Sequence, residues 1–404
     1  MAQILKDSGV PGAALMIAGT CIGGGMLVLP TFTGGAGFVP AVLSNLISWV
    51  YMALTGWMLA QACLWSDKPS VHIASLASDY FGWKGRFIVS LLFLFLYECL
   101  LVSYFSGSAP YFQRLLSRVS ATSGNDAAIS FILMGLLTVL ILWPGSRFFG
   151  WLNAALTTGL ILTFAAMVTE GAPAIEPEYL NYRDWSEFLS PFPVLLGAFG
   201  YHNIVPPLVS SLNKNPAKVR QALWLGTLIP LITYLLWQAV VLGMIPADQL
   251  SVFPEESSIP VIEALARIRH TPTLRTIAFA FTFFAIVTSL LGVAFSMISF
   301  LADLFRKPDS SRFRLLFCVL TIIPPLTIAY SYPNLFVTIF SFAGGIGEAT
   351  LNGIFPIVLF CLGLRHMKQA AKSYIPGGMK TILILSALTL LIMATECMRL
   401  LSGG

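Results

Sequence analysis

The sequence predicts an all-α integral membrane protein. Of its 404 residues, 57% are hydrophobic and only 10% are charged, a balance far from that of soluble globular domains. Apolar runs of about 20 residues or more, the length that a hydrocarbon core of roughly 30 Å requires, recur along the whole chain. Two of these runs are interrupted by glycine and proline, which a membrane helix tolerates only where protein surrounds the freed backbone.

Eleven apolar spans are expected along the chain. Short polar connectors separate them, and the eighth and tenth are long enough to need tilt or a bend. The expected spans cover residues 12–35, 38–62, 87–109, 127–143, 148–170, 191–211, 220–245, 272–303, 314–330, 333–363 and 379–400.

The basic residues predict how the spans are oriented. With the N-terminus in the cytoplasm, sixteen of the 23 lysines and arginines fall in inner loops, as the positive-inside rule requires. The C-terminus is then extracytoplasmic. The expected organisation is a cytoplasmic tail 1–11, a first five-helix repeat 12–171, an outer loop 172–190, a second five-helix repeat 191–364, an inner loop 365–378, and an eleventh helix with the C-terminus 379–404.

The outer connectors and the cysteines suggest no separate chemistry. Residues 170–187 and 246–270 form longer acidic loops, and 261–268 ("VIEALARI") is expected to lie as a helix on the outer surface. The six cysteines form no CxxC pair and have no metal-ligand spacing. We therefore expect no metal, no cofactor and no nucleic-acid partner.

The first span carries the stronger interruption. In "GTCIGGGMLVLP", Gly23, Gly24 and Gly25 are consecutive and Pro30 follows. Each glycine costs a helix about 1 kcal/mol relative to alanine, and polar backbone freed in lipid costs more. A break that lines a protein-enclosed cavity is therefore expected here.

The sixth span, "PFPVLLGAFGYHNIVPPL", carries the second interruption. Gly197 and Gly200 precede the polar residues 201–203, and Pro206 and Pro207 follow. The breaks occupy corresponding places in two five-span halves, a pattern typical of inverted-repeat secondary transporters with a site near the bilayer midplane.

Unwound backbone at these breaks suits a zwitterion. The free amides at a half-helix N-terminus favour a carboxylate, and the free carbonyls of the other half favour an ammonium. Close helix packing is the alternative reading, since Gly19 and Gly23 have GxxxG spacing. Three glycines in a row and a matching break five spans later favour the binding site.

Three segments resemble the bacterial aromatic amino acid permeases, the family of tyrosine and tryptophan transporters. "AGTCIGGGMLVLP" is similar to their AGT-x-IG-x-GML-x-x-P signature, and "GAFGYHNIVPPLVSSL" is similar to their SFGFHGxxPS segment. "TSLLGVAF" (288–295) and "LADLF" (301–305) also resemble this family. Two departures are Gly24, where the family usually carries alanine, and the glutamate of "AGGIGEATLNG" (343–353), which is not in every member.

The resemblance implies fold, place and activity. It implies the five-plus-five inverted-repeat fold of the amino acid/polyamine/organocation superfamily, with discontinuous helices 1 and 6, in a bacterial inner membrane. It also implies proton-driven uptake of an aromatic amino acid, with L-tyrosine fitting best by length and by the "FGYH" and "LADLF" segments. A sodium-coupled or exchange transporter of tryptophan, phenylalanine or another neutral amino acid is the alternative. Neither catalytic motifs nor a repeated channel filter support an enzyme or a channel.

The candidate substrate residues come from the two matched motifs and from the third span. Phe199 and Tyr201 are expected beside an aromatic substrate ring, and Tyr97 and Tyr104 share one face of the third span with Ser108. The full set is Thr20, Cys21, Ile22, Gly23, Gly24, Gly25, Tyr97, Tyr104, Phe199, Gly200, Tyr201 and His202.

The candidates for ion coupling are protonatable groups and hydroxyls inside spans. Glu98 and Glu348 lie well within apolar runs and His202 lies at the second break, and intramembrane ionisable groups face cavities or partners by default. Thr288 and Ser289 sit where sodium-coupled relatives of the fold contribute oxygen ligands. Hydroxyls in membrane helices also bond their own preceding carbonyls, and the resemblance favours protons.

Overall fold

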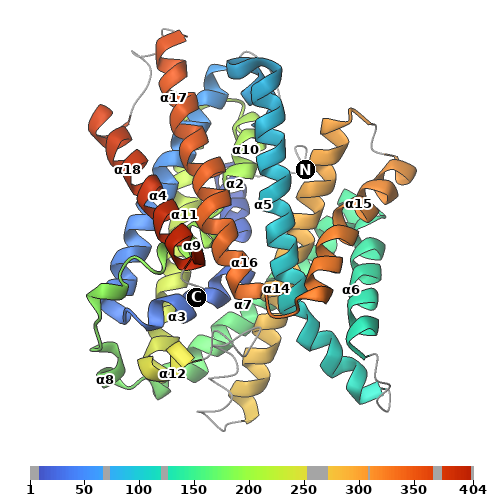
Figure 1. Ribbon diagram of the computed structural model, residues 1–404, viewed down its shortest axis with the longest axis vertical. Helices are drawn as coiled ribbons and strands as arrows, with labels where there is room; N and C mark the ends of the chain where they lie inside the picture. Colours follow the sequence, from blue (N-terminus) through green and yellow to red (C-terminus); the bar gives the residue numbers. More distant parts are fainter. Residues whose placement is uncertain are drawn as a thin grey trace.

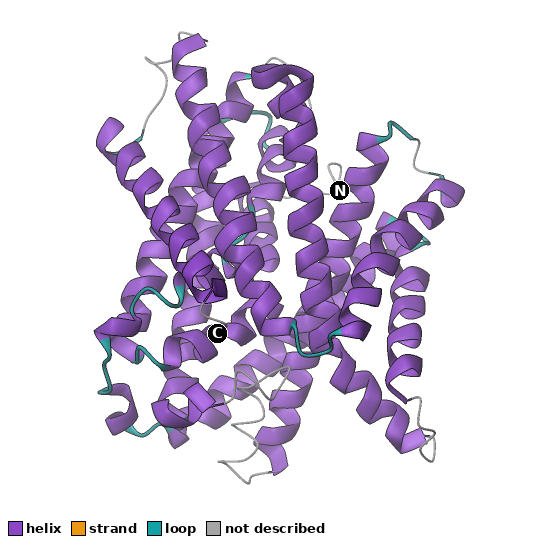
Figure 2. Cartoon of the chain, in the orientation of Figure 1, coloured by secondary structure: helices purple, strands orange, loops and turns teal. Residues whose placement is uncertain are grey.

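The computed structural model describes residues 9–66, 73–119, 126–252, 272–307, 310–366 and 375–401. Within these ranges all regular structure is helical (Figure 2). Nine helices of the described chain are long and apolar enough to cross a membrane, or up to ten when the bent pair Gly9–Cys21 and Gly24–Gly34 counts as one span. The all-α membrane architecture is confirmed.

The fourth expected span corresponds to a shorter apolar helix, Ala127–Leu142, so eleven spans and the inverted repeat stay predictions. In the first half of the chain the helices are α2 (Gly9–Cys21), α3 (Gly24–Gly34), α4 (Phe38–Trp65), α5 (Ile73–Val119), α6 (Asp126–Leu142) and α7 (Ser146–Gly171).

The second half begins with short connecting elements and contains the second interrupted span. Its elements are η1 (Ala172–Ala174), α8 (Pro177–Leu180), η2 (Trp185–Glu187), α9 (Phe192–Ala198), η3 (His202–Ile204), α10 (Val205–Ser211), α11 (Pro216–Met244), α12 (Ala247–Val252), α14 (Pro272–Leu304), α15 (Ser311–Ser331), α16 (Phe336–Phe342), η4 (Ala343–Ile354), α17 (Phe355–His366) and α18 (Met379–Leu401). The surface helix expected at 261–268 lies outside the described residues.

Helix α5 begins earlier than the sequence indicates. It starts at Ile73 and turns at Gly82, whose φ of 68° is a left-handed conformation that favours glycine. The expected third span, 87–109, is therefore the part of a longer element that follows this turn.

The interrupted spans lie inside the bundle. Figure 1 shows α18 on one side of the molecule and α6 and α15 on the opposite side. Helix α3 packs against α9, and α9 packs against η4. Residues far apart in the sequence thus meet at the two breaks.

The tenth span contains a π-helix, η4, between the α-helices α16 and α17. Four glycines allow its backbone to approach neighbours closely. A Cβ on Gly344 would lie 1.9 Å from the carbonyl oxygen of Pro193 in α9, so here the two backbones touch directly. Extended π-helix is rare and is often found at functional sites.

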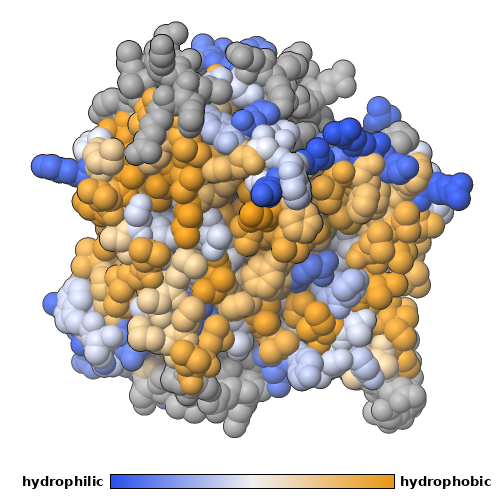
Figure 3. Space-filling view, turned by 45° about the horizontal axis from the view of Figure 1, so that its top comes forward, coloured by the Kyte–Doolittle hydropathy of each residue, from blue (hydrophilic) through white to orange (hydrophobic). Residues whose placement is uncertain are grey.

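The outer surface of the bundle is apolar. Large exposed side chains include Trp151 and Leu162 on α7 and Leu383 on α18. Hydrophobic residues cover much of the face drawn in Figure 3. Such a surface is suited to contact with lipid chains.

Candidate functional site

The first span is broken where three glycines follow one another, as predicted. Helix α2 ends at Cys21, α3 starts at Gly24, and the two halves are bent by 56°. The amide of Gly24 donates to Ser289 Oγ of α14 at 2.8 Å. A free amide at the start of α3 therefore finds a hydroxyl from the eighth span as its partner.

The sixth span is also broken at the predicted place. Helix α9 ends at Ala198, and regular α-helix resumes at Val205. Gly200 faces the carboxyl of Glu348 in η4, since a Cβ on Gly200 would lie 2.7 Å from Glu348 Oε1. Glu348 is 4% exposed and accepts a hydrogen bond from Asn352 Nδ2. The tenth span thus places a buried carboxyl at this break.

The two breaks meet at the hydroxyl of Tyr234, on α11. Its Oη lies 2.7 Å from the carbonyl oxygen of Cys21 and 2.7 Å from that of Ala198. These residues end α2 and α9, whose last carbonyls have no partner within their own helices. One phenol has one proton to donate, so two carbonyls share a single donor.

Aromatic side chains from the third and tenth spans wall the first break. A Cβ on Gly24 would lie 2.6 Å from the Tyr104 ring, and a Cβ on Gly25 would lie 2.7 Å from the ring of Phe340 and 3.1 Å from Ala198 Cα. In this chain a Cβ at Gly24 or Gly25 would require the neighbouring ring to shift. The absence of side chains at these glycines allows the rings and backbone to approach closely.

The two tyrosines of the third span serve different breaks. Tyr104 lies against Gly24 and faces Ser289, whereas Tyr97 faces Asn203 and Ser296. The carboxyl of Glu348 lies near both tyrosines and near Cys21. The structure therefore brings together Tyr97, Tyr104, Cys21 and the glycines of both breaks, as grouped from the sequence.

Three other expected residues turn toward neighbouring helices. Phe199 packs edge-on against Tyr234 at 4.8 Å between ring centres. Tyr201 Oη donates to Met52 O of α4 at 3.1 Å, and His202 Nε2 lies 3.0 Å from Thr55 Oγ1 of the same helix. All three rings are fully buried, and these contacts hold the second break against α4 and α11.

The remaining candidates are less closely tied to the breaks. Thr20 is exposed and donates to Met16 O within α2, and Thr288 donates to Phe284 O within α14, both at 2.8 Å. Ile22 is half-buried. Glu98 is half-buried on α5, and its Oε2 has no hydrogen-bond partner among the described residues.

Sequence reasoning missed Tyr234 and Phe340. Both lie in apolar runs where an aromatic residue is ordinary, so no local pattern distinguishes them. For Phe340 the Gly-rich segment 343–353 that follows it was a usable signal, because close backbone approach at glycines brings neighbouring side chains to the site.

Comparison with known proteins gives a consistent result. The sequence matches the tryptophan/tyrosine permease family over residues 6–395. A tryptophan-specific transport protein of Pseudomonas aeruginosa is 32% identical, with 82% of this chain and 81% of that protein covered. Tyrosine-specific transport system 2 of Haemophilus influenzae is 29% identical over 82% of this chain and 83% of its own length. A tryptophan-specific transport protein of Haemophilus influenzae is 28% identical over 92% of both chains.

Proposed function

This chain belongs to the tryptophan/tyrosine permease family, and we propose that it imports an aromatic amino acid, L-tyrosine, by proton symport. The observation that carries the proposal is the meeting of the two breaks at Tyr234, whose hydroxyl lies 2.7 Å from the last carbonyl of each preceding half-helix. Two carbonyl ends are thereby gathered in one buried place, and the amide end of α3 begins three residues after the first of them, at Gly24. A zwitterion is the ligand that matches them.

The carboxylate end of the substrate belongs at the start of α3. Ser289 Oγ accepts from the Gly24 amide and keeps its own proton, which can be donated to the Tyr104 phenol or to a carboxylate. The rings of Tyr104 and Phe340, at 6.2 Å between centres, offer an apolar wall for an aromatic side chain. L-tryptophan is the second candidate, because relatives with both names are similar to this chain over most of its length.

Glu348 is the proposed proton carrier. Its carboxyl is buried and lies against Gly200 at the second break, where a change of its charge would be felt by the substrate site. Glu98 also lies inside a span, but Glu348 is preferred because it is the carboxyl that contacts a break residue, Gly200. The Thr288 hydroxyl bonds its own helix, which is ordinary behaviour and does not require a sodium ion.

Transport in this proposal is an alternating-access cycle across the inner membrane, with the N-terminus cytoplasmic. The two broken spans rock against the remaining helices, so that the site opens to one side at a time. Neither a cofactor nor covalent chemistry is needed, and the protein acts as a transporter without enzymatic activity.

Uptake of labelled L-tyrosine into proteoliposomes tests the proposal. An inside-alkaline pH gradient should drive saturable accumulation, a protonophore should collapse it, and unlabelled L-tyrosine should compete better than tryptophan, phenylalanine or leucine. Uptake driven by a sodium gradient alone would show that sodium, and not the proton, is the coupling ion. If tryptophan competed most strongly, tryptophan would be the preferred substrate. If no aromatic amino acid accumulated, the proposal of transport would be wrong.

A further inference from the structure

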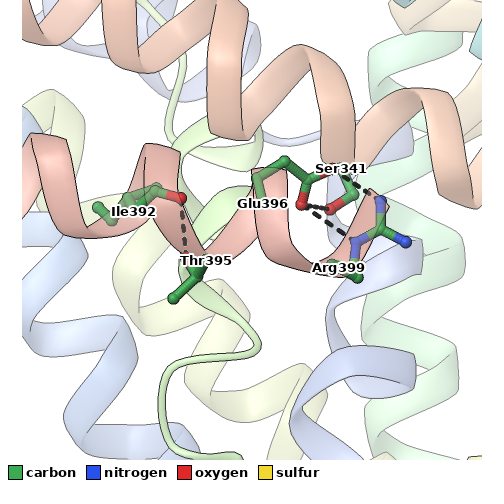
Figure 4. A network of polar contacts seen from close by, with 5 residues as sticks. All are labelled: Ser341, Ile392, Thr395, Glu396 and Arg399. Atoms are coloured by element: carbon green, nitrogen blue, oxygen red, sulfur yellow. Dashed lines mark hydrogen bonds and ion pairs between the residues drawn. The ribbon is translucent and has the colours of Figure 1, made fainter. Parts of the chain in front are cut away.

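The last helix, α18, carries a buried carboxylate that the proposed substrate site does not use. Glu396 has no exposed surface, and its carboxylate accepts from Ser341 Oγ at 2.9 Å (Figure 4). Arg399 binds the same carboxylate, with Nη2 2.7 Å from Oε1 and Nε 3.1 Å from Oε2. Two parallel bonds of this kind fix the plane of the guanidinium, so Glu396 determines where Arg399 points.

The ion pair joins three parts of the bundle. Ser341 belongs to α16, and the stem of Glu396 presses on η4, since a Cβ on Gly345 would lie 2.7 Å from Glu396 Cβ. On the other side, the Arg399 guanidinium lies 5.9 Å from the centre of the Phe32 ring, on α3. This distance is in the range of a cation–π contact. Arg399 therefore links α18 and the tenth span to the half-helix that begins at the first break.

The two halves of the first span differ in burial. From Gly24 to Gly34, α3 is buried at every position except Phe32, which is half-buried beneath Arg399. Gly19 and Thr20, at the end of α2, are exposed. At the far end of α3, Leu250 of α12 lies 2.9 Å from the position of a Cβ on Gly34. Helix α3 is thus the more enclosed half of the first span.

We propose that Phe32, Glu396 and Arg399 form a latch that holds α3 closed over the outer side of the site. The inference rests on the proposed function, because it assigns to these residues one of the two gates of an alternating-access cycle. Glu396 is a positioning residue in this latch, and Arg399 is the group that engages α3. Opening toward the outside requires the guanidinium to leave the Phe32 ring, while the ion pair with Glu396 stays intact.

The chemistry of arginine suits this role. A planar guanidinium bonds a carboxylate through its edge and offers its face to an aromatic ring, whereas a lysine ammonium is a compact charge that cannot do both in one fixed geometry. The contact with Phe32 is the weaker of the two and is the one that breaks. A gate of this kind opens without leaving a buried carboxylate unpaired.

Labelling of Cys21 from the outside tests the latch. Cys21 is buried at the first break, so its thiol reacts with a membrane-impermeant maleimide only when the site opens to the reagent. The full-length protein is used in right-side-out vesicles, with Cys21 kept and the other five cysteines replaced by serine. Phe32→Leu removes the aromatic face and keeps the ion pair, and we expect labelling about two- to fivefold faster than in the parent.

Two further variants separate a latch from a merely structural contact. Arg399→Lys should also speed labelling, because it keeps a charge beside Glu396 and loses the stacked plane. Glu396→Gln combined with Arg399→Gln removes both charges together and should speed labelling at least as much as Phe32→Leu. Thr389→Val is the matched control on α18, since it removes a buried hydrogen bond to Tyr51 that has no link to Phe32, and it should leave the rate unchanged.

The outcomes are distinct from those of the transport assay. Labelling needs no substrate, so a parent protein that fails to accumulate any aromatic amino acid would end the proposed function without deciding the latch. Unchanged labelling in both Phe32→Leu and the double glutamine variant, with normal membrane insertion, would overturn the latch. Faster labelling from the cytoplasmic side in these variants would overturn it as well, because it would place the gate on the wrong side.

Discussion

The two breaks differ in the groups that their neighbours present. At the first break, Gly24 meets neutral groups, the Ser289 hydroxyl and the Tyr104 ring. At the second break, Gly200 meets the buried carboxyl of Glu348. Their shared contact is Tyr234, whose hydroxyl lies between the last carbonyls of α2 and α9.

This difference indicates that breaks at corresponding positions of the two halves can have different functions. A neutral hydroxyl can orient a substrate but does not change its charge near neutral pH, whereas a carboxyl can exchange a proton. We infer that the first break binds the substrate and the second couples the proton. Substitutions at each break can separate these two roles.

The largest effect is expected from filling the glycine positions themselves. A Cβ would lie 2.1 Å from Ser289 Oγ at Gly23 and 2.7 Å from Glu348 Oε1 at Gly200, and a leucine would extend further into both contacts. We expect Gly23→Leu and Gly200→Leu to abolish uptake in proteoliposomes while each protein still inserts in the membrane. Gly19→Leu is the matched control, because no atom lies within 4 Å of its Cβ position. Normal uptake by both break variants would refute the broken-helix site.

Neutralising the carboxyl at the second break should have the next largest effect. In Glu348→Gln the group keeps its shape and loses its exchangeable proton, so accumulation driven by a pH gradient should be lost. Exchange of labelled for unlabelled substrate should persist, because the first break is intact. Glu98→Gln is the control, since Glu98 is the other acidic residue well inside a span, and gradient-driven uptake by that variant should be close to normal. Loss of coupling only in Glu98→Gln would place the proton carrier on α5 and would contradict the role proposed for Glu348.

Removing the contact that the breaks share should weaken both functions together. Tyr234→Phe leaves the carbonyls of Cys21 and Ala198 without their common donor, and a buried acceptor without a partner costs about 1–3 kcal/mol. We expect the initial rate of uptake to fall about tenfold, with accumulation and exchange reduced alike. Tyr51→Phe is the comparison, because it removes an equally buried phenol that bonds Thr389 instead. An effect on only one of the two readouts would contradict a shared role for Tyr234.

The smallest effect is expected at the first break's hydroxyl. Ser289→Ala removes the acceptor of the Gly24 amide, and a hydrogen bond of this kind contributes about 1 kcal/mol. The KM for uptake should rise about fivefold while the response to the pH gradient is unchanged. Thr288→Val should alter neither quantity. If Ser289→Ala instead abolished the response to the driving gradient, the coupling ion would belong at the first break.

Much of the architecture follows from the sequence because an unpaired backbone amide or carbonyl is costly inside a membrane. Gly23, Gly24 and Gly25 in an otherwise apolar run predict a break, and the break is present. The same holds for Gly200. The breaks were predictable because helix propensity and unsatisfied backbone groups are local properties.

The partners across the breaks were not predictable in the same way. Tyr234, Phe340 and Glu396 acquire their roles from helices far away in the sequence, and the chain alone does not say which face of a helix meets a break. Tyr201 shows the opposite case, since its motif suggests a substrate neighbour while its phenol bonds Met52 of α4. Glu396 lies near the end of the last expected span, where a charged residue is ordinary.

The hydroxyl of Tyr234 has a mechanical consequence. A phenolic O–H turns about a single C–O bond, so its proton can move from one carbonyl to the other without displacement of the ring. Whichever half-helix withdraws, the one that stays retains a hydrogen bond at the cost of a small torsion. In the proposed alternating-access cycle, this pivot brings the two arrangements of the bundle closer in free energy, which is what a carrier needs if it is to reset as readily as it opens.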